Sequence, residues 1–182
     1  DIAWHRGLAD ADRISERQYL QMCTYKTGTL ARMAAKMAAV LADADEDLVE
    51  KLGRFAEAVG VAFQIQDDVL DLTGKEFAEK KGGRGQDITE GKRSLMVIHT
   101  LAKAEPRDRR RLIAILNKHT TEQGLRDEAI SIIEKYGAIE YARRFAQKTV
   151  RENWAEVDRL LPRSDAKEKL RAFADYLIER EI

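Results

Sequence analysis

Apolar residues recur at intervals of three and four along most of this sequence, whereas few segments alternate between apolar and polar with a period of two. This pattern predicts an almost entirely helical protein. Prolines stand only at positions 106 and 162, so long helices are left uninterrupted. The predicted helices cover residues 15–42, 47–73, 91–104, 107–118, 122–136, 138–161 and 164–180.

Residues with capping side chains stand where several of these helices begin. Ser15, Asp45, Thr121 and Ser164 each carry an oxygen that can accept a hydrogen bond from a free N–H of a first helical turn. Pro162 marks the end of a helix, because proline has no N–H to continue the hydrogen-bond ladder. These residues set the expected boundaries of the helices around them.

The length and charge of the chain narrow its class. Its 182 residues suffice for one sizeable core, so we expect a single domain over residues 1–182. The 32 basic and 32 acidic residues balance, unlike the basic composition of a nucleic-acid binder. The single Cys23 excludes an internal disulfide framework, and the apolar runs are far shorter than the ~20 residues of a membrane span. A cytoplasmic protein with no nucleic-acid partner and no membrane span is expected.

The segment FQIQDDVLD (63–71) places three aspartates inside a pattern that otherwise predicts a core helix. At about 100° per residue, one arc of about 100° collects small and polar positions, namely Gly60, Gln64, Asp67, Asp68 and Asp71. The opposite side is expected to pack inward and consists of Ile65, Val69 and Leu72. Like charges at this spacing repel, so a positive partner is expected. Glycine inside a helix costs about 0.5–1 kcal/mol, so Gly60 indicates close packing or ligand clearance.

Three carboxylates with no nearby cysteine or histidine form an all-oxygen set that suits Mg²⁺. Magnesium usually binds through one or two carboxylates plus substrate phosphates, so the pattern indicates a phosphorylated substrate. The alternative is a solvated acidic face on a surface helix. The histidines, His5, His99 and His119, share no metal-ligand spacing and are assigned to structural or surface roles.

Two further segments offer cations. The stretch TGKEFAEKKGGRGQDITEG (73–91) contains five glycines and several basic residues, which suggests a lid over an anion. In CTYKTGTL (23–30), glycine and β-branched threonines weaken the helix and predict a kink. Lys26 and Thr27 at this kink can donate to a phosphate oxygen, although an isolated lysine is more often a surface charge.

Small residues follow the kink, at positions 31, 34, 35, 38 and 39, all alanine. Two interpretations stay open. The alanines let another helix approach closely, or they leave room for an apolar ligand.

Three segments together resemble the trans-type isoprenyl diphosphate synthases, or polyprenyl synthetases, especially the archaeal and bacterial farnesyl and geranylgeranyl diphosphate synthases. FQIQDDVLDLTG resembles the second aspartate-rich motif of the family, YLQMCTYKTGTL its Lys-Thr segment, and GQDITEGKRSLMVIHTL its Gly-x-Asp-x-x-x-Gly-Lys stretch. LRAFADYLIER resembles the terminal helix of the family. The resemblance implies an all-α fold, an isoprenoid-synthase-type helical bundle around a central cavity.

The resemblance also implies a prenyltransferase that condenses an allylic diphosphate with isopentenyl diphosphate. In this family, Mg²⁺ held by two aspartate-rich motifs assists ionisation of the allylic diphosphate. The double bond of isopentenyl diphosphate then attacks the carbocation, and a proton is lost. Metal and cationic side chains stabilise the charge that develops on the leaving diphosphate. Mg²⁺ is therefore the expected cofactor.

By resemblance, the metal-binding residues are Asp67, Asp68 and Asp71, with Asp67 the foremost direct ligand. The catalytic residues are Asp67, Asp68 and Lys26. The substrate-binding residues are Lys26, Thr27, Phe63, Gln64 and Lys81. Many members have a lysine five residues before the position of Asp87, but Gly82 stands there in this chain. Lys81 is therefore preferred as the diphosphate contact of the loop, with Lys80 and Arg84 as alternatives.

The first aspartate-rich motif of the family does not occur in the sequence, and DIAWHRG resembles the segment that follows a Gly-Gln pair in full-length members. These features imply the C-terminal portion of a synthase, inactive without its missing N-terminal half and expected to form a homodimer. The alternative is a noncatalytic regulatory or small subunit of a heteromeric synthase. The complete aspartate motif favours the enzyme. The Lys-Thr segment disfavours a squalene or phytoene synthase and a terpene cyclase.

Overall fold

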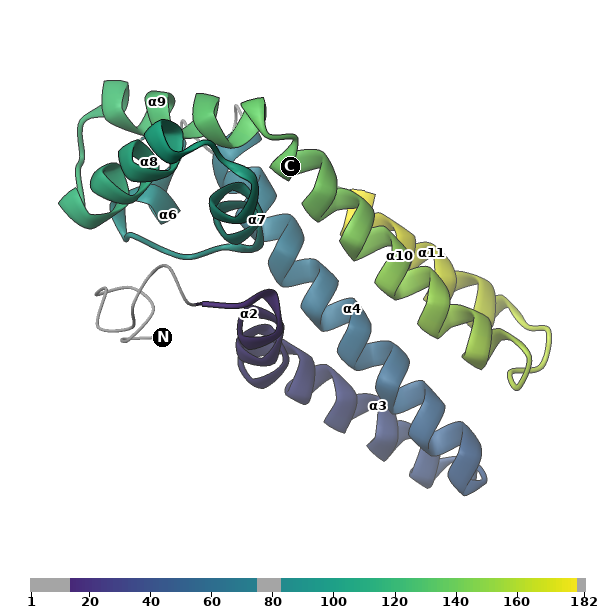
Figure 1. Cartoon of the computed structure of the whole chain (residues 1–182). Coiled ribbons are helices and arrows are strands. Elements are labelled where there is room, and N and C mark those ends of the chain that lie inside the picture. The colour runs from purple at the N-terminus through teal and green to yellow at the C-terminus, as the bar shows by residue number, and fades with distance from the viewer. Residues whose placement is uncertain (1–13, 75–82, 180–182) are drawn as a thin grey trace. The chain divides into compact units, whose positions relative to one another are not determined.

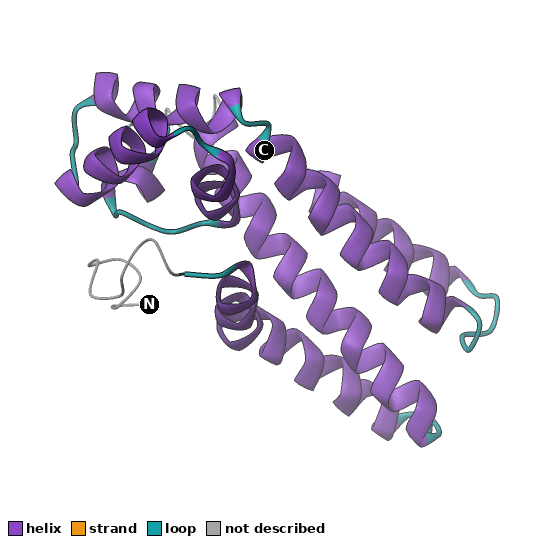
Figure 2. Ribbon diagram, viewed as in Figure 1, coloured by secondary structure: helices purple, strands orange, loops and turns teal. Residues whose placement is uncertain are grey.

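The structure, a computed structural model, describes residues 14–74 and 83–179 (Figure 1). Within these ranges the chain forms helices joined by turns and contains no strand, which confirms the all-α prediction (Figure 2). The elements are α2 (Glu16–Cys23), the π-helical turn η2 (Thr24–Gly28), α3 (Thr29–Leu41), α4 (Glu46–Thr73), α6 (Gln86–Thr89), α7 (Leu95–Lys103), α8 (Pro106–Lys118), α9 (Gln123–Lys135), α10 (Ala138–Asp158) and α11 (Asp165–Glu179).

Three of the predicted capping residues are confirmed. The side-chain oxygens of Ser15, Asp45 and Ser164 each accept the backbone N–H three residues later, at 3.3, 2.8 and 3.2 Å. These bonds satisfy N–H groups that have no acceptor inside the helix, and so they fix the starts of α2, α4 and α11.

One predicted cap and one predicted helix end are wrong. Thr121 does not cap the next helix, because the hydroxyl of Thr120 accepts the N–H of Glu122 at 3.1 Å and α9 begins at Gln123. Pro162 does not end α10. The helix ends earlier, at Asp158, where a turn closes on the carbonyl oxygen of Val157.

The helix predicted over residues 91–104 is shorter than expected. Gly91 has φ +68°, a left-handed conformation that breaks the helical path, and α7 begins at Leu95 with Ser94 as its N-cap. The short helix α6 lies before this break, inside the stretch predicted as an irregular loop. The segment between α4 and α7 is therefore partly helical.

Contacts between residues divide the described chain into two compact units. One unit comprises residues 14–19 and 67–143, and the other comprises residues 20–66 and 144–179. The helices α4 and α10 pass from one unit to the other. The prediction of a single domain over residues 1–182 stays a prediction.

In the first unit, the short helices α6 to α9 pack around a shared apolar core (Figure 1). Its most buried side chains include Leu112, Ile115, Leu116, Ile130 and Ile133, each at most 1% exposed. The stacked rings of His99 and Tyr141, with centroids 3.9 Å apart, join α7 to α10. His99 therefore has the structural role that the sequence predicts.

In the second unit, α3 runs back along the first part of α4, and α11 lies beside α10 (Figure 1). The ring of Phe55 on α4 meets Trp154 on α10 edge to face, with centroids 5.2 Å apart. Cys23 is fully buried and belongs to the core. Among the described helices, none combines the length and the apolar character that crossing a bilayer requires.

Candidate functional site

The aspartates lie on the last turns of α4, above a buried apolar side. Ile65, Val69 and Leu72 are at most 2% exposed, as predicted for the inward face. Asp68 and Asp71 are also buried, at 2% and 7%, whereas Asp67 is more exposed than either. The interpretation as a solvated acidic face is therefore wrong for Asp68 and Asp71.

The carboxylate of Asp68 is held by two donors. The hydroxyl of Tyr19 donates to its Oδ2 at 2.8 Å, and the ammonium of Lys92 donates to its Oδ1 at 2.7 Å. Lys92 also donates to Oδ2 of Asp87 at 2.8 Å. The positive partner that the acidic segment requires is thus Lys92, which joins Asp68 on α4 to Asp87 on α6.

Burial is the largest single influence on the pKa values of Asp68, Asp87 and Lys92. Burial raises the pKa of Asp68 and of Asp87, although the Lys92 ammonium acts in the opposite direction on both. Burial alone would lower the pKa of Lys92, but attraction to the two carboxylates outweighs it and the pKa of Lys92 is raised. The two carboxyl groups on either side of Lys92 thus favour its charged form.

Asp71 has a different role, because its carboxylate accepts hydrogen bonds from backbone N–H groups. Its Oδ1 accepts the N–H of Gln86 at 3.1 Å and its Oδ2 accepts the N–H of Asp87 at 3.0 Å. Its carbonyl oxygen accepts the N–H of Gly85, a left-handed residue with φ +81°, at 2.8 Å. Burial raises the pKa of Asp71, and the two N–H donors oppose the shift. Asp71 thus fixes the start of α6 against the end of α4.

The donor chemistry of this segment suits a hard cation, but the three aspartates are arranged differently from a closed metal cage. The described residues contain no group of three or more carboxylate, imidazole or thiol side chains placed to hold a metal ion. Mg²⁺ needs only one or two carboxylates when substrate phosphates complete its shell. Asp67, the most exposed of the three, fits that requirement. The assignment of Asp68 and Asp71 as metal ligands stays a prediction.

The Lys-Thr segment forms the π-helical turn η2, at the position where the sequence predicts a weakened helix. The N–H and the hydroxyl of Thr29 both donate to the carbonyl oxygen of Thr24, the hydroxyl at 2.9 Å. This wider turn carries Lys26, which is exposed, and Thr27, whose hydroxyl lies 3.4 Å from Oε1 of Gln64 on α4. π-turns inside helices are frequent at functional sites. Phe63, also predicted to bind substrate, is half-buried.

A contact between two glycines places η2 against α4. A Cβ at Gly60 would lie 2.9 Å from Cα of Gly28, which is closer than such atoms approach in proteins. A Cβ at Gly28 would lie 3.1 Å from the carbonyl oxygen of Glu57. Gly60 therefore serves close packing, one of the two reasons expected from the sequence.

The basic loop is only partly described. Lys80 and Lys81 lie outside the described residues, so the preferred diphosphate contact stays a prediction. Nε of Arg84 donates to Oδ1 of Asp127 at 2.9 Å. The alternative contact, Arg84, is thus engaged in an ion pair.

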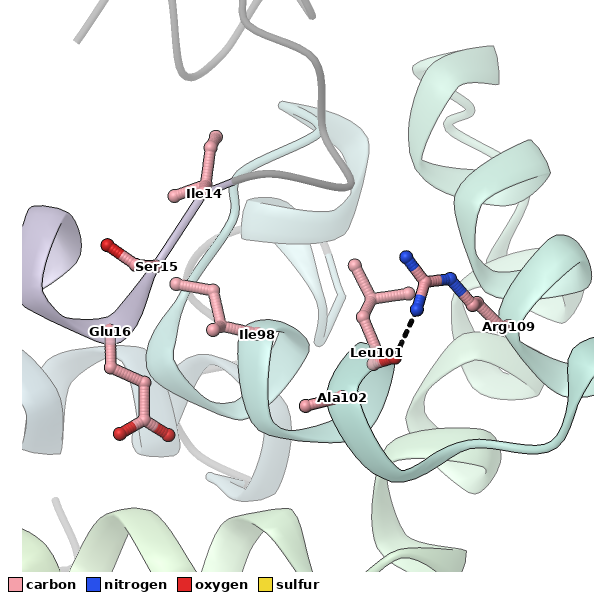
Figure 3. Close-up of a pocket in the computed structure, with 7 residues that line it drawn as sticks. All are labelled: Ile14, Ser15, Glu16, Ile98, Leu101, Ala102 and Arg109. Carbon is pink, nitrogen blue, oxygen red and sulfur yellow. Dashed lines mark hydrogen bonds between the residues drawn. The ribbon is translucent and has the colours of Figure 1, made fainter.

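Two pockets occur away from the predicted site residues. One of about 270 Å³ in the first unit is lined by Ile14, Ser15, Glu16, Ile98, Leu101, Ala102 and Arg109 (Figure 3). There Arg109 donates to the carbonyl oxygen of Leu101 at 3.0 Å. Another of about 290 Å³ in the second unit is lined by Leu20, Thr24, Arg54, Glu57, Ala58, Val61, Phe145, Thr149 and Asn153. Neither assigns a role to the aspartates.

Three residues that bond to Asp68 or Asp71 were not predicted from the sequence as site residues, namely Tyr19, Asp87 and Lys92. Asp87 and Lys92 are the aspartate and lysine of the Gly-x-Asp-x-x-x-Gly-Lys stretch, so that motif contained the signal for both. Tyr19 is the first residue of the quoted Lys-Thr segment, but no chemistry was assigned to it, and it lies 49 residues before its partner Asp68.

Comparison with known proteins identifies the family. The family model described as polyprenyl synthetase matches residues 1–133. The chain is 39% identical, over 175 residues, to a short chain isoprenyl diphosphate synthase of Methanothermobacter thermautotrophicus, covering 96% of this chain and 53% of the relative. It is 33% identical, over 171 residues, to a geranylgeranyl diphosphate synthase of Methanosarcina mazei, covering 93% and 50%.

Solved structures give the same result. Geranylgeranyl pyrophosphate synthetase from Pyrococcus horikoshii superimposes with a TM-score of 0.81 at 32% identity, over 92% of this chain and 50% of that one. A polyprenyl synthase from Caulobacter crescentus, complexed with calcium and isoprenyl diphosphate, gives 0.84 at 26% identity, over 94% and 52%.

The chain thus spans about half the length of the relatives that it matches. The matched family model nevertheless covers well over half of this sequence. This chain belongs to the polyprenyl synthetase family.

Proposed function

We propose that this chain takes part in head-to-tail prenyl transfer, the condensation of an allylic diphosphate with isopentenyl diphosphate, and supplies the second aspartate-rich motif. The observation that supports this most is the way the end of α4 is held. Lys92 and Tyr19 hold Asp68, and the N–H groups of Gln86 and Asp87 hold Asp71. Two of the three aspartates are thereby fixed beside the more exposed Asp67.

In this proposal Asp67 is the foremost ligand of Mg²⁺, with Asp68 and Asp71 as the other members of the motif. When bound, Mg²⁺ would neutralise charge that develops on the leaving diphosphate. Asp68 and Asp71 are also positioning residues, because their hydrogen bonds restrict the rotamers of the last turns of α4. A fixed carboxylate does not have to reorganise when the charge appears.

Lys26 and Thr27 donate to the allylic diphosphate in this proposal. The π-turn widens the helix at that point, and the exposed ammonium of Lys26 is available to an anion. Gln64 orients the hydroxyl of Thr27, and Phe63 lies near the prenyl tail. Lys81 is the proposed diphosphate contact of the loop. Homodimer formation and a cytoplasmic location complete the proposal as family expectations.

The test fuses this chain to the part of the Methanothermobacter thermautotrophicus relative that this chain does not match. It then measures the incorporation of labelled isopentenyl diphosphate. Asp67→Asn is expected to lower the rate by about 100-fold or more, because it removes a charge that acts on the reacting groups. The matched control is Asp165→Asn on α11, where the aspartate side chain is 78% exposed and pairs with Lys169.

Both variants are expected to retain the helical circular dichroism of the parent protein. Equal rates for Asp67→Asn and Asp165→Asn would remove Asp67 from the reaction.

A further inference from the structure

The helix α3 has its polar and apolar sides reversed relative to an ordinary surface helix. Its charged residues, Arg32 and Lys36, point toward α4. Arg32 donates to Glu57 at 3.0 Å and to Glu50 at 3.3 Å, and Lys36 also donates to Glu50. A surface helix ordinarily turns its charges to water and its apolar stripe to the core. Here the charges occupy the inner side.

The outward side of α3 is apolar. At about 100° per residue, five large side chains fall within one arc of about 100°. They are Leu30, Met33, Met37, Val40 and Leu41, exposed by 68%, 51%, 56%, 59% and 84%. Between Thr29 and Leu41, the sequence has no charged residue other than the inward pair. We call these five side chains the outer face of α3.

Small residues border the outer face. Ala34 and Ala38 are exposed, whereas Ala39 is buried on the opposite side. Only part of the predicted alanine cluster therefore packs within the second unit. An exposed face that combines long, flexible methionines with neighbouring alanines offers ridges and gaps into which another helix packs. Contiguous exposed apolar surface of this kind marks an interaction site.

We infer that the outer face of α3 is a docking surface for a polypeptide segment equivalent to the part of the synthase fold that lies outside this chain. The chain matches 53% of its Methanothermobacter thermautotrophicus relative, and it superimposes on 50% of the Pyrococcus horikoshii structure. In these single-chain proteins, as much polypeptide again accompanies the matched part. The inference rests on family membership and not on the proposed reaction.

The occupant is an apolar helical segment and not a highly charged one. The outer face presents no charge to pair with, and the charges of α3 are already engaged with α4. A charged segment placed here would lose hydration without gaining ion pairs.

The experiment coexpresses the tagged 182-residue chain with the uncovered part of the Methanothermobacter thermautotrophicus relative as a separate chain. Native mass spectrometry is expected to show a one-to-one complex. Met33→Glu combined with Met37→Glu is expected to weaken the complex at least about tenfold in dissociation constant, because buried anions would lack partners. The matched control is Phe173→Glu with Tyr176→Glu on α11, where the side chains are 58% and 63% exposed.

The four substituted side chains are exposed, so circular dichroism of both double variants is expected to match the parent chain. Met33→Ala with Met37→Ala provides a milder change that is expected to weaken the complex less. Asp67→Asn is expected to leave complex formation unchanged, which separates this inference from the proposed reaction.

Three outcomes would overturn the inference. The parent chain forms no complex with the added segment, or the α3 and α11 pairs weaken it equally. In the third outcome, sedimentation of the chain alone shows a dimer that Met33→Glu with Met37→Glu dissociates. That result would identify a second copy of this chain as the occupant.

Discussion

The ion pairs near the two ends of α4 differ in how far they are buried. Near its start, Glu50 and Glu57 pair with Arg32 and Lys36, and these four side chains are between 26% and 40% exposed. Near its end, the ion pair of Asp68 with Lys92 is buried, with the side chains 1% and 10% exposed. The same chemical groups therefore serve in two environments along one helix.

The comparison teaches that an ion pair has no fixed energetic value. Exposed pairs gain little, because water screens the charges and long side chains lose freedom. A buried pair contributes little net stability when intact, but removal of one partner leaves a charge without water or counterion. The end of α4 is thus the part of the helix that is sensitive to loss of a charge.

The largest effect is expected at the buried cation. Lys92→Met keeps most of the side-chain volume but leaves Asp68 and Asp87 without their ammonium, and we expect it to lower the free energy of unfolding by about 3–5 kcal/mol. Urea unfolding measures the change. Adding Asp68→Asn to Lys92→Met is expected to recover part of the loss, because one buried charge is removed. No recovery would argue against burial of charge as the cause.

Asp71→Ala separates hydrogen bonding from ion pairing at the same end. The substitution leaves the N–H groups of Gln86 and Asp87 without their acceptor, at an expected cost of about 2–4 kcal/mol in unfolding free energy. Asp71→Asn retains one carbonyl acceptor and is expected to cost less. Hydrogen exchange at residues 86 and 87 should quicken in Asp71→Ala. Unchanged exchange there would contradict this role of Asp71.

Gly60→Ala tests how η2 packs against the middle of α4. The added methyl group meets Cα of Gly28 at 2.9 Å, so η2 must shift from α4. We expect a net loss of about 1–2 kcal/mol, because overpacking outweighs the gain in helix propensity. Gly124→Ala on α9 is the control, since no atom beyond the adjacent residues and the backbone of its own helix lies within 4 Å of the added methyl group. Thermal unfolding that ranks these two variants in the reverse order would refute the packing argument.

The smallest effect is expected at the exposed end. Lys36→Met is the same substitution as Lys92→Met, but the side chain of its partner Glu50 is 40% exposed and can be hydrated when the lysine is removed. The urea midpoint is expected to be indistinguishable from that of the parent. A loss as large as that of Lys92→Met would abolish the contrast between the two ends of α4.

The helices were predictable because their signals are local. Apolar spacing placed α4 within one residue of its predicted start, and Ser15, Asp45 and Ser164 cap helices through bonds that reach only three residues. The π-helical turn at Lys26 and Thr27 also has a local signal, since the threonine and glycine run weakens the helix there. The boundary near Pro162 failed because a turn around Val157 closed first.

The contacts of the aspartates were less predictable. The sequence showed that Asp67, Asp68 and Asp71 share a helical face, and it required a cation near them. It suggested metal and the loop lysines as partners, but it did not identify Lys92, which lies 24 residues after Asp68. The backbone path through Gly85 and Gly91, both left-handed, brings Lys92 back to α4.

By itself, the sequence determined the helical class, most helix boundaries, the acidic segment and the family motifs, because each depends on residues close together along the chain. Tertiary structure alone decided which aspartates are buried, which carboxylate receives Tyr19 and Lys92, and which side of α3 stays exposed. Those outcomes depend on burial and on partners that are far apart in sequence. Local spacing places a side chain on a face, but only packing determines what that face meets.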